Sequence, residues 1–276
     1  MSDQYLDPDR LYTEKESFLV VLDSRNATGY KNDSMHSSVH FDFNEPIRFT
    51  KNSIRLTCSV LHFQSPNSLY NINETNSILT TSINGTMTIY YIDYGNYNAN
   101  TLLSKLISLL PSAFTITFNT TTNKFKFVHA TNDFTIGGTI APIIGFQTSV
   151  LSTSQSLTMP YTCNFNGIQN LNIHMTNIVT KNVDSFNKSP GNIIQSIPVE
   201  PGSNTISYIK NADFNFIVNQ DIIDDIQIDL KDDLNNYLNF NNQHWNLTLY
   251  FSIIRDIDRF ANLNNFHSIL YSGTLY

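Results

Sequence analysis

Period-two alternation of apolar and polar residues recurs along most of this chain, and it limits the possible folds more than any other feature. Val39, Phe41 and Phe43, for example, alternate with His40 and Asp42. Successive side chains of a strand point to opposite faces of a sheet, so such runs indicate strands with one buried face. Further strands are predicted at 17–24, 53–63, 78–83, 171–178, 192–198, 205–209, 214–218, 222–230 and 247–253. The fold class is therefore predicted to be all-β dominated.

The first of these runs differs from the rest. Residues 17–24 read SFLVVLDS, a continuous apolar run in place of an alternating one. A strand of this kind is expected to be buried on both faces.

One stretch, 86–136, has helical character. Its helix is predicted from the spacing of Ala99, Leu102, Leu103, Leu106, Ile107 and Leu110, which form one apolar stripe. Asn98 or Asn100 can cap the helix start, and Pro111 ends it.

A strand at 87–92 precedes this helix, and strands at 114–118 and 124–128 follow it. The stretch is therefore predicted to form a β-α-β-β unit. Neither half of the remaining chain has enough strands to close a core alone, so the unit is most simply an insertion in a loop.

The remaining strands, about eight, have the spacing of a β-sandwich or jelly roll. We therefore predict a single jelly-roll β-sandwich with an inserted β-α-β-β subdomain. Its predicted parts are an N-terminal arm at 1–16, a first part of the jelly roll at 17–85, an inserted domain at 86–150 and a second part of the jelly roll at 151–276.

The charge pattern argues against several classes of function. The formal net charge is −7 and the basic residues are scattered, whereas nucleic-acid binding needs a basic face. Charged residues make up only 14% of the chain, which favours close packing against other subunits because few charges must be desolvated. An AT-rich genome is the alternative reason for the many asparagines, but it explains the low charge less well. No membrane span or secretory signal is expected, and two cysteines form no disulfide framework.

The histidines and cysteines give no clear ligand set. His36 and His40 would point the same way on one strand, but about 13 Å apart, which is too far to share a metal. We expect both to face solvent. Cys58 is predicted to be a small core residue. Three other histidines lack ligand companions at a recognisable spacing: His129, His174 and His267.

An acidic run is the most prominent charged feature, and it contains Asp221, Asp224, Asp225, Asp229, Asp232 and Asp233. Asp229, Asp232, Asp233 and Asn235 could supply oxygen ligands to calcium, but the glycine and final glutamate of an EF-hand loop are missing. Two interpretations stay open, a solvated turn and a surface cation site between subunits.

Trp245, the sole tryptophan, begins the last predicted strand. It is expected to anchor the core, and a sugar-stacking platform is the alternative. The loop Tyr94–Tyr97 is a second candidate platform. Gly137-Gly138 lacks the Lys-Ser/Thr of a phosphate loop, and no Gly-x-Ser-x-Gly elbow or prominent carboxylate pair occurs. We therefore predict no catalytic, cofactor-binding or metal-binding residue, and no enzyme activity.

Several stretches together resemble a known family. They are FLVVLDSRNA, FDFNEPIRF, QSPNSLYNINETNSI, IDYGNYNANTLLSKLISLL, FTITFNTTTNKFKF and IQIDLKDDLNNYLNFNNQHWNLTLYFSI, within about residues 17–255. They resemble single jelly-roll minor capsid proteins of virophages and large double-stranded DNA viruses, above all the penton proteins. The resemblance is one of pattern, without an invariant motif, so no site residue is transferred.

The resemblance implies a jelly roll that forms a ring of five at each icosahedral vertex, with the inserted domain outside and no active site. The implied partners are further copies of the chain, the major capsid protein and a host surface contacted through the inserted domain. The implied location is the virion, after synthesis and assembly in the host cytoplasm. Two alternatives stay open: a minor capsid or cement protein elsewhere in such a shell, and a carbohydrate-binding jelly-roll module.

Overall fold

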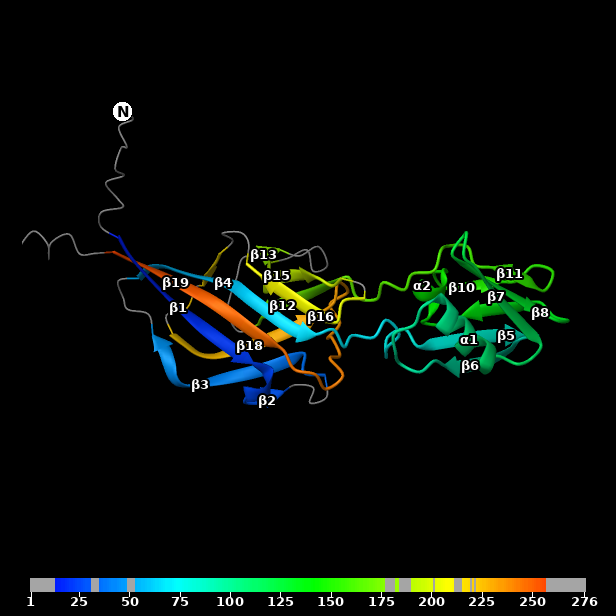
Figure 1. Ribbon diagram of the computed structural model, residues 1–276, viewed down its shortest axis with the longest axis horizontal. Helices are drawn as coiled ribbons and strands as arrows, with labels where there is room; N and C mark the ends of the chain where they lie inside the picture. The colour runs from blue at the N-terminus through cyan, green and yellow to red at the C-terminus, as the bar shows by residue number, and fades with distance from the viewer. Residues whose placement is uncertain are drawn as a thin grey trace, which may run out of the picture. The chain divides into compact units, whose positions relative to one another are not determined.

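The chain forms two compact units in the computed structural model (Figure 1). The structure describes residues 13–30, 35–48, 53–176, 182–183, 190–200, 202–210, 215–218, 220 and 222–256. The first unit contains the chain up to Asn67 and most of the chain from Asn170 onward, and the second is built by the continuous segment Ser68–Gln169. The second unit is therefore an insertion in the first.

Two antiparallel sheets form the first unit. Sheet A contains, in spatial order, β1 (Thr13–Asp23), β19 (Asn246–Asp256), β4 (Ser53–Pro66) and β16 (Thr205–Ile209), with β17 (Phe216–Val218) also paired to β4. Sheet B contains β15 (Ile193–Pro198), β12 (Asn170–Met175), β18 (Ile222–Lys231), β3 (Ser38–Arg48) and β2 (Gly29–Tyr30). A short 3-10 turn, η2 (Ser24–Asn26), follows β1, and β13 (Asn182–Val183) pairs with β14 (Pro190–Gly191).

The pairing of early strands with late strands defines the fold. Strand β1 pairs with β19, β3 pairs with β18, and β4 lies between β19 and β16. Strand β12 lies between β18 and β15. Eight strands nested in this way across two sheets are the topology of a jelly roll. The predicted fold class is therefore confirmed.

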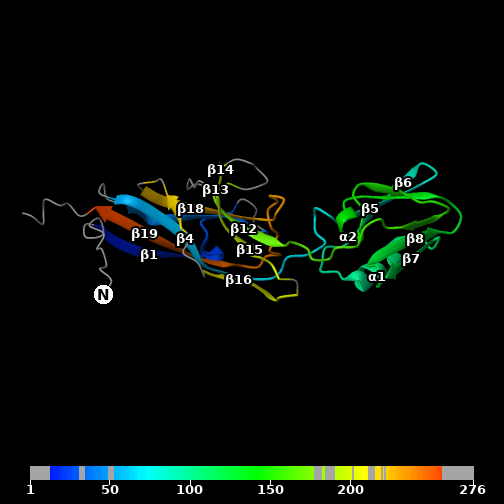
Figure 2. The ribbon, with the colours of Figure 1, turned by 90° about the horizontal axis from the view of Figure 1, so that it is seen from above.

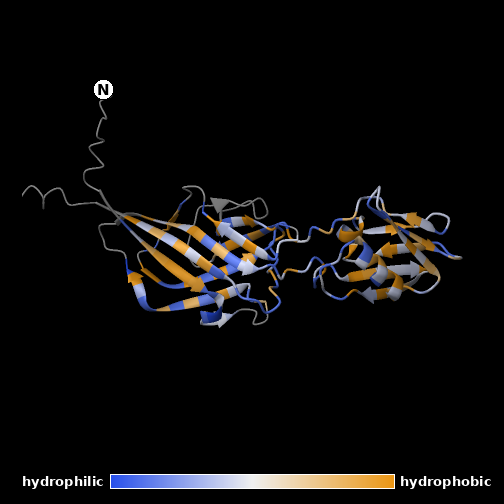
Figure 3. Ribbon diagram, in the orientation of Figure 1, coloured by the Kyte–Doolittle hydropathy of each residue, from blue (hydrophilic) through white to orange (hydrophobic). Residues whose placement is uncertain are grey.

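The core of this sandwich comes from the inward faces of both sheets. Leu56, Cys58 and Val60 of β4 are buried, as are Ile226 and Ile228 of β18. Figure 3 shows apolar and polar residues alternating along these strands. The alternation seen in the sequence therefore marks the buried face of each sheet.

Two strands of the sandwich are longer than predicted. Strand β1 begins at Thr13 and pairs with β19 from its first residue, so the last part of the predicted arm is strand. Residues 1–12 lie outside the described part of the chain. Strand β3 runs past Pro46 to Arg48, because its pairing with β18 shifts register between Asp42 and Ile47. Proline has no amide proton to donate to a neighbouring strand. Pro46 is tolerated here because the regular hydrogen bonding between β3 and β18 is interrupted at this point.

The second unit is a smaller two-sheet domain with its own core (Figure 2). One sheet has the order β10 (Ser149–Leu151), β9 (Phe134–Gly137), β5 (Ile78–Ile83) and β6 (Thr86–Tyr91). The other has the order β11 (Ser156–Thr158), β8 (Lys124–His129) and β7 (Phe114–Asn119). Helix α1 (Ala99–Leu109) and the short helix α2 (Ala141–Ile144) complete the unit.

Helix α1 forms as the sequence predicts. The Asn98 side chain accepts hydrogen bonds from the amides of Asn100 and Thr101, both at 3.0 Å, so Asn98 is the cap. Leu102 and Leu106 are fully buried in the core of the unit.

The β-α-β-β order is present as β6, α1, β7 and β8, but these elements do not share one sheet. Strand β6 pairs with β5, along six residue pairs, whereas β7 pairs with β8. Asn84 and Gly85 both have positive φ and form the tight turn that joins β5 to β6. Strand β5 was expected in the jelly roll and lies in the inserted unit instead. The observed unit, Ser68–Gln169, therefore extends beyond the predicted 86–150 at both ends.

Asn71 joins the beginning of the second unit to its end by hydrogen bonds. Its side-chain amide donates to the carbonyl oxygens of Tyr97 at 2.7 Å and Phe165 at 3.1 Å, and its oxygen accepts from the Tyr97 amide at 2.9 Å. A side chain at Gly167 would lie about 3.1 Å from the Asn71 Cβ, so this approach favours glycine. The two ends of the insertion are thus held by contacts within the unit.

These boundaries predict the result of excision. Replacing Ser68–Gln169 with a Gly/Ser linker of about six residues, long enough to pass between the sheets, should leave a folded sandwich. Replacing only 86–136 should give an insoluble product, because it removes α1, β7 and β8 but leaves the apolar Leu79 and Ile140 without a core. Circular dichroism and cooperative thermal unfolding of both proteins would check this. A folded 86–136 deletion, or an unfolded full excision, would contradict these boundaries.

Candidate functional site

Trp245 anchors one end of the sandwich and is completely buried. Its ring packs between Phe41, edge-on at 6.2 Å, and Phe63 at 6.1 Å between ring centroids. Its indole nitrogen donates to the backbone carbonyl of His36 at 2.7 Å. The core interpretation is therefore confirmed, and the ring has no exposed face on which a sugar could stack.

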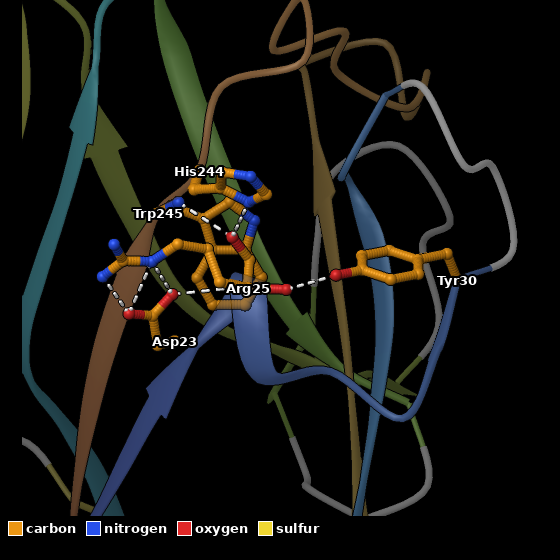
Figure 4. Close-up of polar contacts among 6 residues, drawn as sticks. Asp23, Arg25, Tyr30, His244 and Trp245 are labelled. Atoms are coloured by element: carbon orange, nitrogen blue, oxygen red, sulfur yellow. Dashed lines mark hydrogen bonds and ion pairs between the residues drawn. The ribbon is translucent and has the colours of Figure 1, made fainter.

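Polar residues surround the backbone of Trp245 (Figure 4). Ser24 Oγ accepts from the Trp245 amide at 3.0 Å and lies 3.1 Å from Nδ1 of His244. The Ser24 carbonyl accepts from the Tyr30 hydroxyl at 2.5 Å. These contacts join the end of β1, strand β2 and the segment that enters β19.

A serine beside a histidine raises the question of nucleophilic catalysis. Ser24 is fully buried, and its hydroxyl oxygen is already an acceptor for a backbone amide. Asp23 does not orient the His244 ring, because its carboxylate binds Arg25, whose Nε lies 3.0 Å from both oxygens. This guanidinium holds the pKa of Asp23 below its usual range. The Ser24–His244 pair therefore lacks both the open nucleophile and the orienting acid of a catalytic triad.

His36 also belongs to this cluster, which corrects the expectation that it faces solvent. It precedes β3 with a φ of 53° and is only 6% exposed. Its ring stacks on His244 at 4.4 Å between centroids, and its Nδ1 lies 3.0 Å from the Gln243 carbonyl oxygen. Sequence alone placed His36 on the strand with His40, because the backbone turn between them has no local signature.

His40 lies elsewhere, on the outer face of sheet B. Its Nε2 lies 2.8 Å from the Asp42 carboxylate and 3.5 Å from that of Asp225. His36 and His40 thus contact different partners, and they share no site.

The other candidate residues are structural where they are described. Burial raises the pKa of the Cys58 thiol well above its usual value, which confirms a core residue and not a nucleophile. His129 Nδ1 accepts from the amides of Thr131 and Asn132 in a turn. His174 Nδ1 lies 2.8 Å from Asn192 Oδ1. His267 lies outside the described residues.

The acidic run is dispersed over several environments. Asp229 is buried and accepts from the Ser38 hydroxyl at 2.6 Å and the Tyr237 hydroxyl at 3.2 Å. Asp232 accepts from two amides of the turn that follows β18, and Asp233 binds Asn170. These bonds already use carboxylate oxygens of the three acids that were considered as calcium ligands, whereas Asn235 lies in the same turn with a φ of 65°.

The remaining acids of the run do not complete a cation site. Asp224 is exposed, Asp225 faces His40, and Asp221 lies outside the described residues. Within the described part of the chain, no group of three or more His, Cys, Asp and Glu residues is arranged to hold a metal ion.

The two tyrosines of the second candidate sugar platform, Tyr94–Tyr97, lie in different environments. Tyr97 packs against the core of the second unit, and its backbone is held by Asn71. Tyr94 is 54% exposed. One exposed ring in this loop does not make a platform for a sugar of several residues.

Exposed aliphatic side chains lie at both edges of the outer face of sheet A. Alternation from the buried Val20 and Leu22 places Leu19 and Val21 outward on β1, where they are 54% and 70% exposed. At the opposite edge of the sheet, Ile209 of β16 and Ile217 of β17 are 71% and 40% exposed. Between these edges, the outward side chains that the structure describes on β4 and β19 include Thr248 and Tyr250, which are partly exposed, and Thr57, Ser59 and Ser252, which their neighbours bury. Lys210 adds one ammonium group, which lies 3.0 Å from Ser59 Oγ.

The continuous apolar run at 17–24 was the sequence signal for this surface. It predicted burial on both faces, but within one chain only the inward face is buried. Sequence reasoning missed that the outward face of β1 is exposed. An apolar run predicts that both faces are buried, but it does not tell whether the residues that bury them belong to the same chain. Among the described residues, no helix has the length and apolar character needed to cross a membrane.

Comparisons with known proteins give a likeness in structure. No protein-family model and no curated protein matches the chain. The chain is similar to the crystal structure of the selenomethionine-labelled mavirus penton protein, with 11% sequence identity and a TM-score of 0.44. The match covers 87% of this chain and 100% of that chain. The jelly-roll assignment rests on the strand pairing described above.

The buried acid of the run gives a testable difference. Asp229→Ala should destabilise the protein by about 2–3 kcal/mol, because the buried Ser38 hydroxyl loses its charged acceptor. Asp224→Ala, which changes an exposed acid of the same strand, should stay within about 0.5 kcal/mol of the unchanged protein. Urea denaturation would measure both. Equal effects of the two substitutions would show that burial of Asp229 has no energetic consequence.

Proposed function

We propose that this chain is a structural capsid protein, and that it serves as a penton, five copies of which form a ring at an icosahedral vertex. The jelly roll is a fold of viral capsid proteins, lectins and cupins, so the fold alone leaves several functions open. The choice among them depends on which surfaces the fold leaves for binding.

The outer face of β1 is the observation that carries the proposal. Leu19 and Val21 lie next to each other on one face of an edge strand and are largely exposed. Burial of apolar surface contributes about 25 cal/mol per Å², so a neighbour that covers these side chains gains stability from them. An exposed aliphatic pair on a strand edge therefore supports a role in which β1 contacts another subunit.

The opposite edge of sheet A supports a ring. Ile209 and Ile217 are exposed at this edge, beside His62 and Thr57 of β4, so the edge offers apolar side chains that differ in sequence from the pair at β1. Contacts between two different patches are heterologous, and they close into rings when the rotation per subunit allows it. Few of the outward side chains that the structure describes on this face are charged, so little desolvation of charge opposes such a contact.

The partners and location follow from the same proposal and from the resemblance in sequence. The copies of the ring would bind one another through the jelly roll, and the major capsid protein would surround the ring. The second unit would face outward and contact the host surface. The protein would be synthesised and assembled in the host cytoplasm and would reside in the virion.

Two alternatives make different predictions. A minor capsid or cement protein at another position would use the same fold with a different number of copies. A carbohydrate-binding module would need an exposed platform, but Trp245 is buried and Tyr94 is a single exposed ring of its loop. The capsid role is therefore favoured over the carbohydrate module, and the number of copies tests the penton role.

Native mass spectrometry and electron microscopy of the purified protein test the proposal. Pentamers and five-membered rings would support the penton role. A dimer or trimer would favour another capsid position, and a monomer at high concentration would contradict self-assembly.

Substitutions at the two edges test the contact surfaces. Val21→Asp and Ile209→Asp should each weaken self-association at least about tenfold, because each places a carboxylate against an apolar neighbour. Ile107→Asp is the matched control, since Ile107 is 56% exposed on α1 and does not belong to sheet A. Analytical ultracentrifugation over a concentration series would compare them. Unchanged association of both edge variants would exclude sheet A as the contact surface.

A further inference from the structure

Three chain segments meet at the stacked histidines. His36 comes from the segment before β3, His244 from the segment before β19, and Ser24 from the end of β1. The imidazole rings lie 4.4 Å apart between centroids with an angle of 23° between their planes. The pair lies beside the residue that holds this end of the core, because the His36 carbonyl accepts from the Trp245 indole.

We propose that the stacked His36–His244 pair is an acid-sensitive latch, which holds the Trp245 end of the sandwich closed at neutral pH and opens it when both rings are protonated. The proposal concerns the first unit alone and does not depend on the capsid role. Histidine is the side chain whose charge changes in the range between about pH 5 and pH 8.

The first reason is repulsion between two positive rings. Neutral imidazoles can stack, but two imidazolium rings at this separation repel each other. His36 is 6% exposed, so little water is available to screen its charge. Stacking of the pair is therefore compatible with at most one full charge.

The second reason is that no neighbouring acid is free to compensate. Arg25 and Asp23 are the charged side chains that act on His244 besides His36, and Tyr30 adds a titratable hydroxyl next to His36. The Asp23 carboxylate already binds the Arg25 guanidinium through both oxygens. The Tyr30 ring lies 5.4 Å from the His36 ring, and its hydroxyl donates to the Ser24 carbonyl. The single carboxylate of the cluster, Asp23, is therefore already paired with Arg25. It is not available to neutralise the positive charges of two protonated histidine rings.

The third reason is the hydrogen bond of His244. Ser24 Oγ accepts from the Trp245 amide, so its single hydrogen can be donated to His244 Nδ1, which lies 3.1 Å away. A proton on Nδ1 makes the ring a donor to the serine oxygen, so the hydroxyl hydrogen of Ser24 loses its acceptor on the ring. Because Ser24 is fully buried, protonation of His244 forces a rearrangement where the end of β1 meets the start of β19.

The effect on stability has a definite sign. Burial lowers the pKa of His244, and the nearby His36 and Arg25 lower it further. In the unfolded chain the ring protonates around its ordinary value of 6.5, so below that pH the unfolded state binds more protons than the folded state. Stability of the latch is therefore complete above that value and falls as the pH is lowered through it.

The place of the latch gives this opening a structural consequence. Asn246, the first residue of β19, pairs with Gln64 near the end of β4. The latch thus lies at the end of the sandwich where the chain leaves the first unit at Asn67. Acid is expected to loosen this end while the ladders of sheets A and B persist.

The sole tryptophan provides a direct readout of the test. Fluorescence of Trp245 should shift to longer wavelength as the pH is lowered from about 7.5 to about 5, while far-UV circular dichroism stays constant. His244→Asn should abolish most of this shift, because asparagine can keep a partner for Ser24 but cannot gain a proton. The unchanged protein should also lose about 2–4 °C more in thermal midpoint over this pH range than His244→Asn.

Two further variants make the test decisive. His36→Asn should also abolish the shift, and asparagine tolerates the positive φ at this position. His62→Asn is the matched control, since His62 pairs with Thr248 in sheet A, outside the stack, and should keep the shift. An unchanged spectrum of the starting protein at about pH 5, or an equal shift in both latch variants, would overturn the proposal. A parallel loss of circular dichroism in all proteins would overturn it as well, because it would indicate general acid unfolding.

Discussion

The pairing of β4 with β19 is the contact on which the sandwich depends. Leu247, Leu249 and Phe251 of β19 are fully buried, and they pair with Phe63, Val60 and Cys58 of β4, which are also buried. Strand β19 lies between β1 and β4 and pairs with both. Sheet A therefore cannot form until residues 246–256 have joined it. Such long-range pairing incurs the entropy of closing a long loop before it gains any contact. A segment inserted between β4 and β12 must therefore fold by itself, and the second unit does so with a core of its own.

Local patterns in the sequence predicted local structure well. The apolar stripe and the Asn98 cap define α1 within one residue, and β7 and β8 lie close to their predicted positions. These elements are decided by side chains near in sequence, so their signals lie within a short window. The alternation on β4 and β18 likewise identified which residues are buried.

The sequence did not indicate which sheet each strand joins. Residues 78–83 have the strand character of the sandwich segments, but the Asn84-Gly85 turn pairs them with β6 and thus places them in the second unit. The same limit applies to the candidate site. His36 and His244 are far apart in the chain, and neither residue alone has a local signal for stacking. Three-dimensional contacts between distant segments decided both outcomes.

The apolar face of sheet A and the histidine latch separate two tasks in one unit. Association through side chains such as Val21 and Ile209 depends on apolar burial, which varies little over the range in which histidine titrates. The proposed latch at Trp245 depends on two stacked imidazole rings and would respond to that range. In the proposed ring, a subunit would keep its neighbours while one end of its sandwich loosens. Acid would then change the surface that each subunit presents without first removing the contacts between subunits.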